Sequence, residues 1–138
     1  MKLFSNLLLL MMGAFFLAGI TYSCKKEVSP RLIITVKDTS GKALKGAKVH
    51  AYKGATANNG TPNKEMDQKG TTDGNGEVTF DFKYSAVLDV DVIYNFSRFD
   101  STSMLTVQDS LLGKRVVKIE SKRQRGDNVY REEVIAEK

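Results

Sequence analysis

Hydrophobic and polar residues alternate along most of the chain after residue 30. Val78, Phe80 and Phe82, for example, alternate with acidic and hydroxyl side chains, as the two faces of a half-buried strand do. Segments of this kind, or rich in β-branched residues, are 32–38, 47–52, 78–82, 88–94, 102–107, 114–122 and 129–136. No segment of this region repeats its apolar residues with a helical period. The pattern therefore predicts one all-β domain over 31–138, a seven-stranded antiparallel β-sandwich with one solvated face per sheet.

The first 23 residues have a different pattern. A charged start at Lys2 precedes the apolar run Leu7–Ile20, and small or polar residues follow it at 21–23. This order is typical of a secretory signal peptide, predicted here over 1–23. The apolar run of 14 residues is short against the roughly 20 that span a bilayer. Because the uncharged stretch Leu3–Cys24 is longer, an uncleaved anchor helix is the alternative.

The single cysteine of the chain, Cys24, stands where cleavage is expected, and Lys25 follows it directly. The segment resembles the lipobox of bacterial lipoproteins, in the looser form found in Bacteroidota. Ser23 fits the small residue before the cysteine, whereas Tyr22 is bulky for its place. The resemblance implies lipidation of Cys24, a tether over 24–30 and attachment to the outer membrane, on its periplasmic or surface face. The alternative is an ordinary signal peptide that leaves a free thiol.

Turn-forming residues separate the predicted strands at regular places. Three runs, Ile34–Asp38, Gly41–Val49 and Thr72–Phe80, resemble the carboxypeptidase regulatory-like domain, and related Cna B-type domains share them. The likeness covers about 32–94. It implies an Ig-like, transthyretin-like sandwich that serves as a structural or binding module rather than an enzyme. In it Gly41 would turn the first hairpin, Leu44 would close the sandwich edge and Asp73–Gly76 would turn before a core strand.

Charge narrows the class of partner. The formal net charge is +5 and falls to +4 when Lys2 leaves with the leader. The excess lies late in the chain, where Glu120 is the one acid among Lys114, Arg115, Lys118, Lys122, Arg123 and Arg125. Since 111–125 holds no aromatic residue on which bases could stack, nucleic-acid binding is not predicted. We interpret the segment as a solvated strand face, with attraction to an anionic membrane or polysaccharide as the alternative.

The segment 53–70 contains no Val, Ile, Leu or Phe and is long for a connection between strands. One interpretation is a mobile insertion. The other is a ligand-contacting loop that uses Asn58, Asn59 and Lys64. Together with the basic strand 114–123, this loop is the basis of the alternative function, a glycan- or peptide-binding accessory protein.

The residues give little indication of a catalytic site. His50 is the one histidine, so a Ser-His-Asp triad would have to use it, and no Gly-x-Ser-x-Gly elbow is present. Asp89 and Asp91 share one strand face and are interpreted as solvated acids. The run beginning at Asp73 fails as a calcium loop because its twelfth position is Tyr84. We predict no catalytic, cofactor or metal residue, and a membrane, an envelope protein or a glycan as partner.

Two short motifs indicate surface modification. Asp100-Ser101-Thr102 and Asp109-Ser110-Leu111 resemble the O-glycosylation acceptor of Bacteroidota, which would make Ser101 and Ser110 acceptor residues. Arg125-Gly126-Asp127 matches an integrin-binding tripeptide. We interpret it as turn chemistry, because Gly and Asp are common turn residues.

Overall fold

The computed structural model describes residues 26–54, 64–123 and 126–138. Its strands are β1 (Glu27–Val28), β2 (Arg31–Asp38), β3 (Lys48–Tyr52), β4 (Asp67–Thr71), β5 (Glu77–Asp81), β6 (Ala86–Asp100), β7 (Leu105–Ile119), β8 (Lys122–Arg123) and β9 (Val129–Ala136), with a 3-10 turn η3 at Lys64–Met66. One sheet has the order β5-β2-β9 and the other β4-β3-β6-β7, while β1 pairs with β8. The predicted all-β sandwich is confirmed.

The core lies between the two larger sheets. Alternate residues of β2 and β6 point inward, and Leu32, Ile34, Leu88 and Val90 are completely buried. Each apolar side chain of this size stabilises the fold by about 1.5–3 kcal/mol through burial. Strands β2 and β9 run parallel over eight residue pairs, an arrangement that the expectation of purely antiparallel pairing did not include. The parallel pair places β2, from the start of the domain's sequence, beside its last strand, β9, in one sheet.

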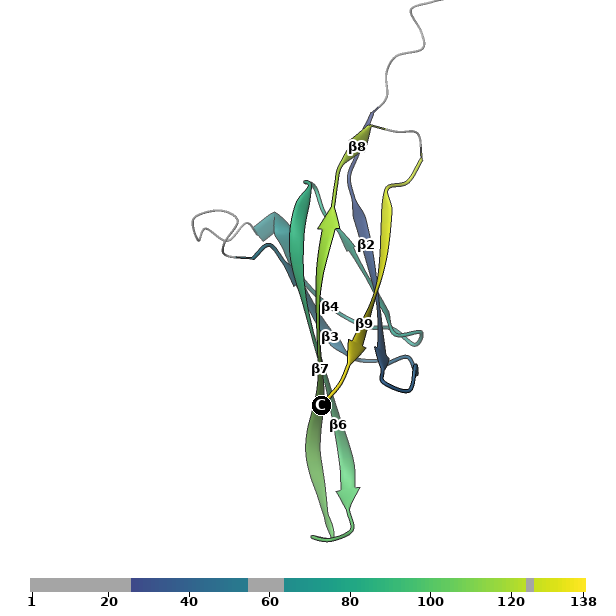
Figure 1. Ribbon diagram of the computed structural model, residues 1–138, viewed down its shortest axis with the longest axis vertical. Coiled ribbons are helices and arrows are strands. Elements are labelled where there is room, and N and C mark those ends of the chain that lie inside the picture. Colours follow the sequence, from purple (N-terminus) through teal and green to yellow (C-terminus); the bar gives the residue numbers. More distant parts are fainter. Residues whose placement is uncertain (1–25, 55–63, 124–125) are drawn as a thin grey trace, which may run out of the picture.

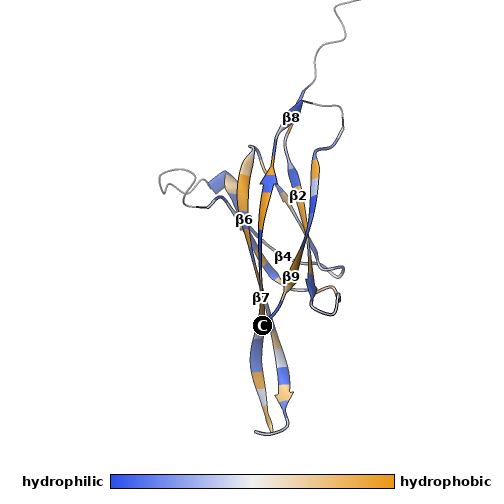
Figure 2. Cartoon of the chain, in the orientation of Figure 1, coloured by the Kyte–Doolittle hydropathy of each residue, from blue (hydrophilic) through white to orange (hydrophobic). Residues whose placement is uncertain are grey.

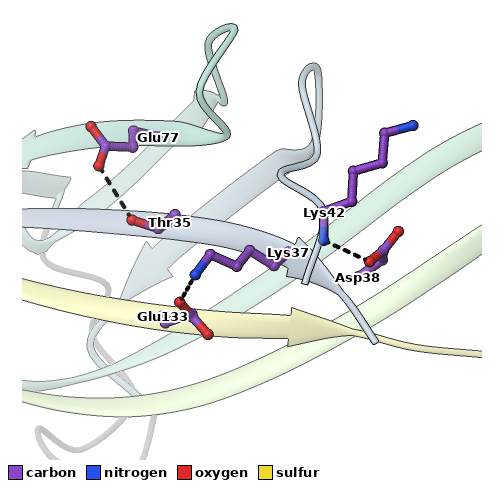
Figure 3. A network of polar contacts seen from close by, with 6 residues as sticks. All are labelled: Thr35, Lys37, Asp38, Lys42, Glu77 and Glu133. Atoms are coloured by element: carbon purple, nitrogen blue, oxygen red, sulfur yellow. Dashed lines mark hydrogen bonds and ion pairs between the residues drawn. The ribbon is translucent and has the colours of Figure 1, made fainter. Parts of the chain in front are cut away.

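Turns in the body have the predicted places. Gly41 has φ 83° and Gly76 has φ 76°, values that glycine adopts without a steric penalty. Asp38 fixes the first turn, since its carboxylate accepts hydrogen bonds from the backbone N–H of Ser40 (2.8 Å) and of Lys42 (3.0 Å). Figure 3 shows Asp38 and Lys42 in this turn and two ties from β2 to its neighbours, Thr35 to Glu77 and Lys37 to Glu133.

The strand boundaries differ from the prediction in several places. β1 lies within the predicted tether, and β6 continues beyond the predicted strand 88–94 to Asp100. The predicted strands 102–107 and 114–122 are both parts of β7, which pairs with β6 over an unbroken run of 15 residues. The predicted loop 53–70 contains η3 and the strand β4, which pairs with β3. β4 has no large apolar residue because Gly70 faces β5. A Cβ on Gly70 would lie 2.7 Å from a side-chain methyl of Val78.

The β6–β7 hairpin is longer than the body of the sandwich (Figure 1). Strand β3 pairs with β6 only as far as Ile93, and beyond that point the two strands continue as a two-stranded ribbon. We call residues 95–110 the ribbon. Its turn lies at one end of the long axis, and β8, with its partner β1, lies at the opposite end (Figure 1). Figure 2 shows the hydrophobic residues of β6 concentrated within the body, with a mixed pattern in the ribbon.

The end opposite the ribbon is held by Asn128, one of two buried polar residues among those described. Its side-chain amide donates hydrogen bonds to the carbonyl of Glu120 (2.6 Å) and to that of Val28 (3.2 Å). Asn128 therefore connects the start of the described chain to the late strands. Within the described ranges, no helix is long and apolar enough to span a membrane.

Candidate functional site

The two segments predicted to contact a ligand lie on the same sheet, at its opposite edges. Strands β3 and β4 flank the long loop, β7 carries the basic residues, and β6 lies between them in the order β4-β3-β6-β7. Because side chains alternate across a strand, the residues of β3 and β6 that do not enter the core point to the outer face of this sheet. We call this surface the outer face. It contains His50 and Tyr52 from β3 and Asp89 and Asp91 from β6.

A continuous row of polar contacts crosses the outer face. The Nε2 of His50 lies 2.7 Å from a carboxylate oxygen of Asp67 on β4, and the His50 ring stacks on Tyr52 with centroids 4.5 Å apart. The hydroxyl of Tyr52 donates a hydrogen bond of 2.9 Å to Asp91. This hydrogen bond, with burial and the negative charges of Asp91 and Asp89, raises the pKa of Tyr52. The row holds two aromatic rings between two carboxylates, those of Asp67 and Asp91.

Three residues of the basic strand form ion pairs, two of them with acids from other strands. Lys114 lies 3.5 Å from Asp91 on β6, Arg115 lies 2.7 Å from Glu132 on β9, and Lys118 lies 2.7 Å from Glu120. The hydrogen bond to Glu120 raises the pKa of Lys118, and the same contact lowers the pKa of Glu120. Because Asp91 and Glu132 come from other strands, the charge excess of this segment is smaller in the fold than in the linear sequence.

An open groove of about 600 Å³ lies where the outer face meets the end of β9. Ile93, Leu112 and Ile135 give it an apolar floor, and each is 43–58% exposed. Asp91, Lys114, Glu137 and Lys138 supply its polar rim. The two sides of the groove are held together by Leu112 and Glu137, which exchange two backbone hydrogen bonds of 2.8 and 2.9 Å. Sequence reasoning missed Ile135, Glu137 and Lys138, since no local pattern indicates a contact between residues 112 and 137.

Gly113 allows this contact. A Cβ at this position would lie 2.7 Å from a methyl of Val134 and 2.9 Å from the carbonyl oxygen of Ile135. Such a Cβ cannot fit without a shift of the β9 backbone. Gly113 therefore lets β7 cross close over β9, and the crossing brings the apolar residues of the groove together.

The remaining predicted residues lie apart from the outer face. Ser101 is in the ribbon turn, Ser110 is on β7, and both are exposed. Lys64 is exposed in η3. Cys24, Asn58 and Asn59 lie outside the described residues.

The carboxylate of Asp73 is used inside its turn, which agrees with the interpretation as a hairpin turn. It accepts hydrogen bonds from the backbone N–H of Asn75 (2.8 Å) and of Glu77 (3.0 Å). These bonds lower the pKa of Asp73, with the bond from Glu77 as the larger cause. In the described parts of the chain, no three His, Cys, Asp or Glu side chains are arranged to hold a metal ion.

No protein-family model matches the chain, and neither does any curated protein. Among solved structures, the chain is similar to the major pilin subunit BcpA of Bacillus cereus, with 16% identity and a TM-score of 0.53. That match covers 80% of this chain and 30% of the pilin, so the chain spans less than a third of the protein that it resembles. At this identity the likeness shows the fold, an Ig-like β-sandwich, and nothing finer.

Two further structures match less well. A candidate carbohydrate-binding protein from Pseudomonas aeruginosa is 16% identical with a TM-score of 0.48, and the match covers 80% of this chain and 93% of that one. Chlorocatechol 1,2-dioxygenase from Pseudomonas putida is 13% identical with a TM-score of 0.46, covering 86% of this chain and 64% of the enzyme.

Proposed function

We propose that the chain is a lipid-anchored module of a bacterial cell envelope that acts through its surface and without catalysis. The lipobox-like segment around Cys24 supports the anchor, and the three runs similar to the carboxypeptidase regulatory-like domain support a structural or binding module. A lipoprotein carries a diacylglyceryl group, and two acyl chains hold a protein durably where one does not. Lys25 and Lys26 would add attraction to anionic headgroups.

One observation carries this proposal, namely the placement of the two ends. Strand β1 begins three residues after Cys24 in the sequence and lies at the end of the molecule opposite the ribbon turn (Figure 1). A molecule held by Cys24 would therefore direct its ribbon away from the membrane. An elongated, anchored sandwich with a projecting ribbon suits a protein that presents a surface to partners.

The anchor is tested by labelling cells with an alkyne fatty acid and isolating the full chain. The wild type is expected to carry the label and to sediment with the membrane, while Cys24→Ala loses the label. Ser23→Ala is the matched control, since it keeps a small residue before the cysteine and should still be labelled. Equal labelling of the wild type and Cys24→Ala would refute lipidation. Membrane retention of an unlabelled wild type would support the uncleaved anchor helix.

The outer face supports a second candidate function, binding of a glycan or an extended peptide. The observation that favours it is that the loop-flanking strands and the basic strand share one sheet, and that the groove lies where this sheet meets the end of β9. Aromatic rings can stack on the apolar face of a sugar, while carboxylates and Lys114 can bind its hydroxyl groups. The groove of about 600 Å³ lies in the usual range for a small-ligand site.

Binding is tested on an array of envelope glycans and peptides. Tyr52→Phe removes the hydroxyl that donates a hydrogen bond to Asp91 and keeps the ring, whereas Tyr52→Ala removes both the hydroxyl and the ring. A site on the outer face predicts partial loss of retention for the first variant and complete loss for the second. Val129→Ala, on the other sheet, serves as the control. Unchanged retention of Tyr52→Ala would exclude the outer face as the binding surface.

We also propose Ser101 and Ser110 as O-glycan acceptors. Both hydroxyl-bearing residues are exposed on the ribbon, where a transferase could reach them. The mass of the chain from its native host would show the modification, and Ser101→Ala and Ser110→Ala should each remove one glycan. A native chain of unmodified mass would contradict the proposal.

A further inference from the structure

The ribbon leaves one side of β7 without a neighbouring strand. β7 is the last strand of its sheet. Beyond its outer edge, the bridge from Leu112 to Glu137 is the one backbone pairing in the described chain, and the side chain of Lys138 forms an ion pair with Asp109. The segment 105–111 therefore presents backbone hydrogen-bonding groups to solvent over about 23 Å, at the usual rise per residue. Such an edge is a template for pairing with another strand.

The backbone direction along this edge follows from Leu112. Its N–H and C=O both bond Glu137 rather than β6. In an antiparallel ladder alternate residues point the same way, so Thr106, Gln108 and Ser110 also direct their backbone groups away from β6. The N–H of Ser110 is already bonded to the carboxylate of Asp109 at 2.9 Å. The groups of Thr106 and Gln108 and the carbonyl of Ser110 are available to a partner strand.

The usual protection of a sheet edge is sparse here. The segment 105–111 contains no Pro, Lys or Arg. Asp109 is its one charged residue, and it forms ion pairs with Arg98 on β6 and with Lys138. The β6–β7 register has no bulge that would twist the edge away. One face of the ribbon continues the inward face of the sandwich and holds the stacked pair Tyr94 and Phe96, with ring centroids 6.0 Å apart. Leu105, on the same face, is 64% exposed.

We propose that the β7 edge of the ribbon pairs antiparallel with the β7 edge of a second copy of this chain. A two-fold axis at Gln108 makes the edge self-complementary. It opposes Thr106 to the Ser110 of the second copy as a hydrogen-bonded pair. It also opposes Asp109 to a Val107, so that no like charges meet. On pairing, the Ser110 N–H gives up its hydrogen bond to the Asp109 carboxylate and donates one to the carbonyl of the opposing Thr106.

Steric limits favour this orientation. Two ribbons that pointed the same way would pair with their axes about 10 Å apart, whereas a four-stranded sheet is about 19 Å wide, so the two bodies would overlap. With opposite orientations, each body lies beyond the turn of the other ribbon. The β6 edge offers a shorter seam, because β3 occupies β6 up to Ile93. A seam as short as 106–110 buries little surface, and such interfaces are typically weak and concentration-dependent.

Two proline variants separate pairing from folding. Gln108→Pro removes an N–H that points away from β6, and Ser97→Pro removes the corresponding N–H at the other edge of the ribbon. Both variants lose the same side-chain hydrogen bond, from Gln108 Nε2 to Ser97 Oγ at 2.8 Å, which makes them a matched pair. Sedimentation velocity of the full chain in detergent, over a range of concentrations, measures the dimer. We expect Gln108→Pro to weaken dimerisation by more than about tenfold, since the seam loses two central hydrogen bonds, and Ser97→Pro to leave it unchanged.

A crosslink fixes the register. In the proposed pair the Cα atoms of the two Gln108 residues lie about 5.5 Å apart, within the reach of a disulfide or a short thiol crosslinker. Gln108→Cys should form a covalent dimer. Thr106→Cys should not, because the two Cys side chains at position 106 would lie four residues apart along the seam. The unsubstituted chain, with Cys24, is the background control. A monomer at all concentrations, equal loss in both proline variants, or capture of a different protein in place of a second copy would each overturn the proposal.

Discussion

Strand β6 passes through two environments along its 15 residues. In the body, the inward side chains Leu88, Val90 and Val92 are at most 1% exposed, because β2 and β9 lie opposite them. In the ribbon, the same face of the same strand continues with Phe96, which is half-buried, and Arg98, which is exposed. The alternation marks a face, but burial depends on a second sheet to cover that face. The body therefore supplies the stability of the molecule, and the ribbon supplies an uncovered surface.

The largest expected contrast is between a core residue and a ribbon residue on this shared face. Leu88→Ala removes a fully buried side chain and should reduce the free energy of unfolding by about 2–5 kcal/mol. Phe96→Ala loses mainly its stacking on Tyr94 and should cost less than about 1.5 kcal/mol. Denaturant unfolding at low protein concentration compares the two. Similar losses would mean that the ribbon face is covered in the folded protein.

The body also contains a buried polar tie that has no counterpart in the ribbon. The hydroxyl of Thr72, 4% exposed, accepts a hydrogen bond from the N–H of Ala47 (2.9 Å) and donates one to the carbonyl of Leu44 (2.5 Å). Thr72→Val keeps the shape but leaves both buried backbone groups unpaired. We expect a loss of about 2–4 kcal/mol in the free energy of unfolding.

The exposed strand residue Thr79 provides the control for this change. Thr79→Val should alter stability by no more than about 0.5 kcal/mol. If thermal unfolding shows the two variants to be equally stable, the hydroxyl of Thr72 does not tie these segments together.

The junction of body and ribbon depends on Gly113. Gly113→Ala places a Cβ 2.7 Å from Val134 and 2.9 Å from a β9 carbonyl, and overpacking of this kind typically costs about 1–3 kcal/mol. Gly74→Ala is the control, since nothing lies within 4 Å of its Cβ position. Thermal unfolding measures both. A neutral Gly113→Ala would show that the crossing of β7 over β9 is not a close contact.

The same residues explain which parts of the fold were predictable. The alternation of Val78, Phe80 and their neighbours, and the turn glycines, predict strands and turns because their causes are local. The polar run Gln108–Ser110 and then Gly113 interrupt the apolar pattern of β7, so the pattern predicts two strands where the fold has one. Gly113 is required by its close contact with Val134. Val134 lies 21 residues further along the chain, so no local pattern indicates this contact. Strand β4 was missed for a similar reason, because Gly70 is required by Val78 on another sheet.

The candidate site was predictable only in part. The sequence predicts a binding surface from the loop 53–70 and the basic strand, whereas it indicates only surface or solvated roles for His50, Asp89 and Asp91. The sheet order places these three residues on the same sheet as the basic strand. Cross-strand pairs such as Arg115 with Glu132 depend on register, and a shift of one residue would reverse every side chain. The sequence therefore overstated the free positive charge of this region.

The smallest expected contrast concerns two aspartates with the same local role. Asp73 fixes a turn of the body, and Asp100 fixes the ribbon turn by accepting a hydrogen bond from the N–H of Thr102 at 3.0 Å. Backbone hydrogen bonds lower the pKa of both carboxyl groups. A carboxylate whose folded pKa is depressed stabilises the folded state above its unfolded pKa, about 3.9 for Asp. That contribution is lost as the pH falls through the folded pKa.

Asp73→Asn keeps an acceptor oxygen but cannot ionise, so its deficit in unfolding free energy should be present at neutral pH and should shrink as the pH falls below about 4. Asp100→Asn should leave global unfolding unchanged at every pH, because the ribbon turn lies outside the body. Its effect should be confined to faster amide hydrogen exchange near residues 101–104. Equal pH-dependent losses of global stability in the two variants would show that the ribbon folds and unfolds as one unit with the sandwich.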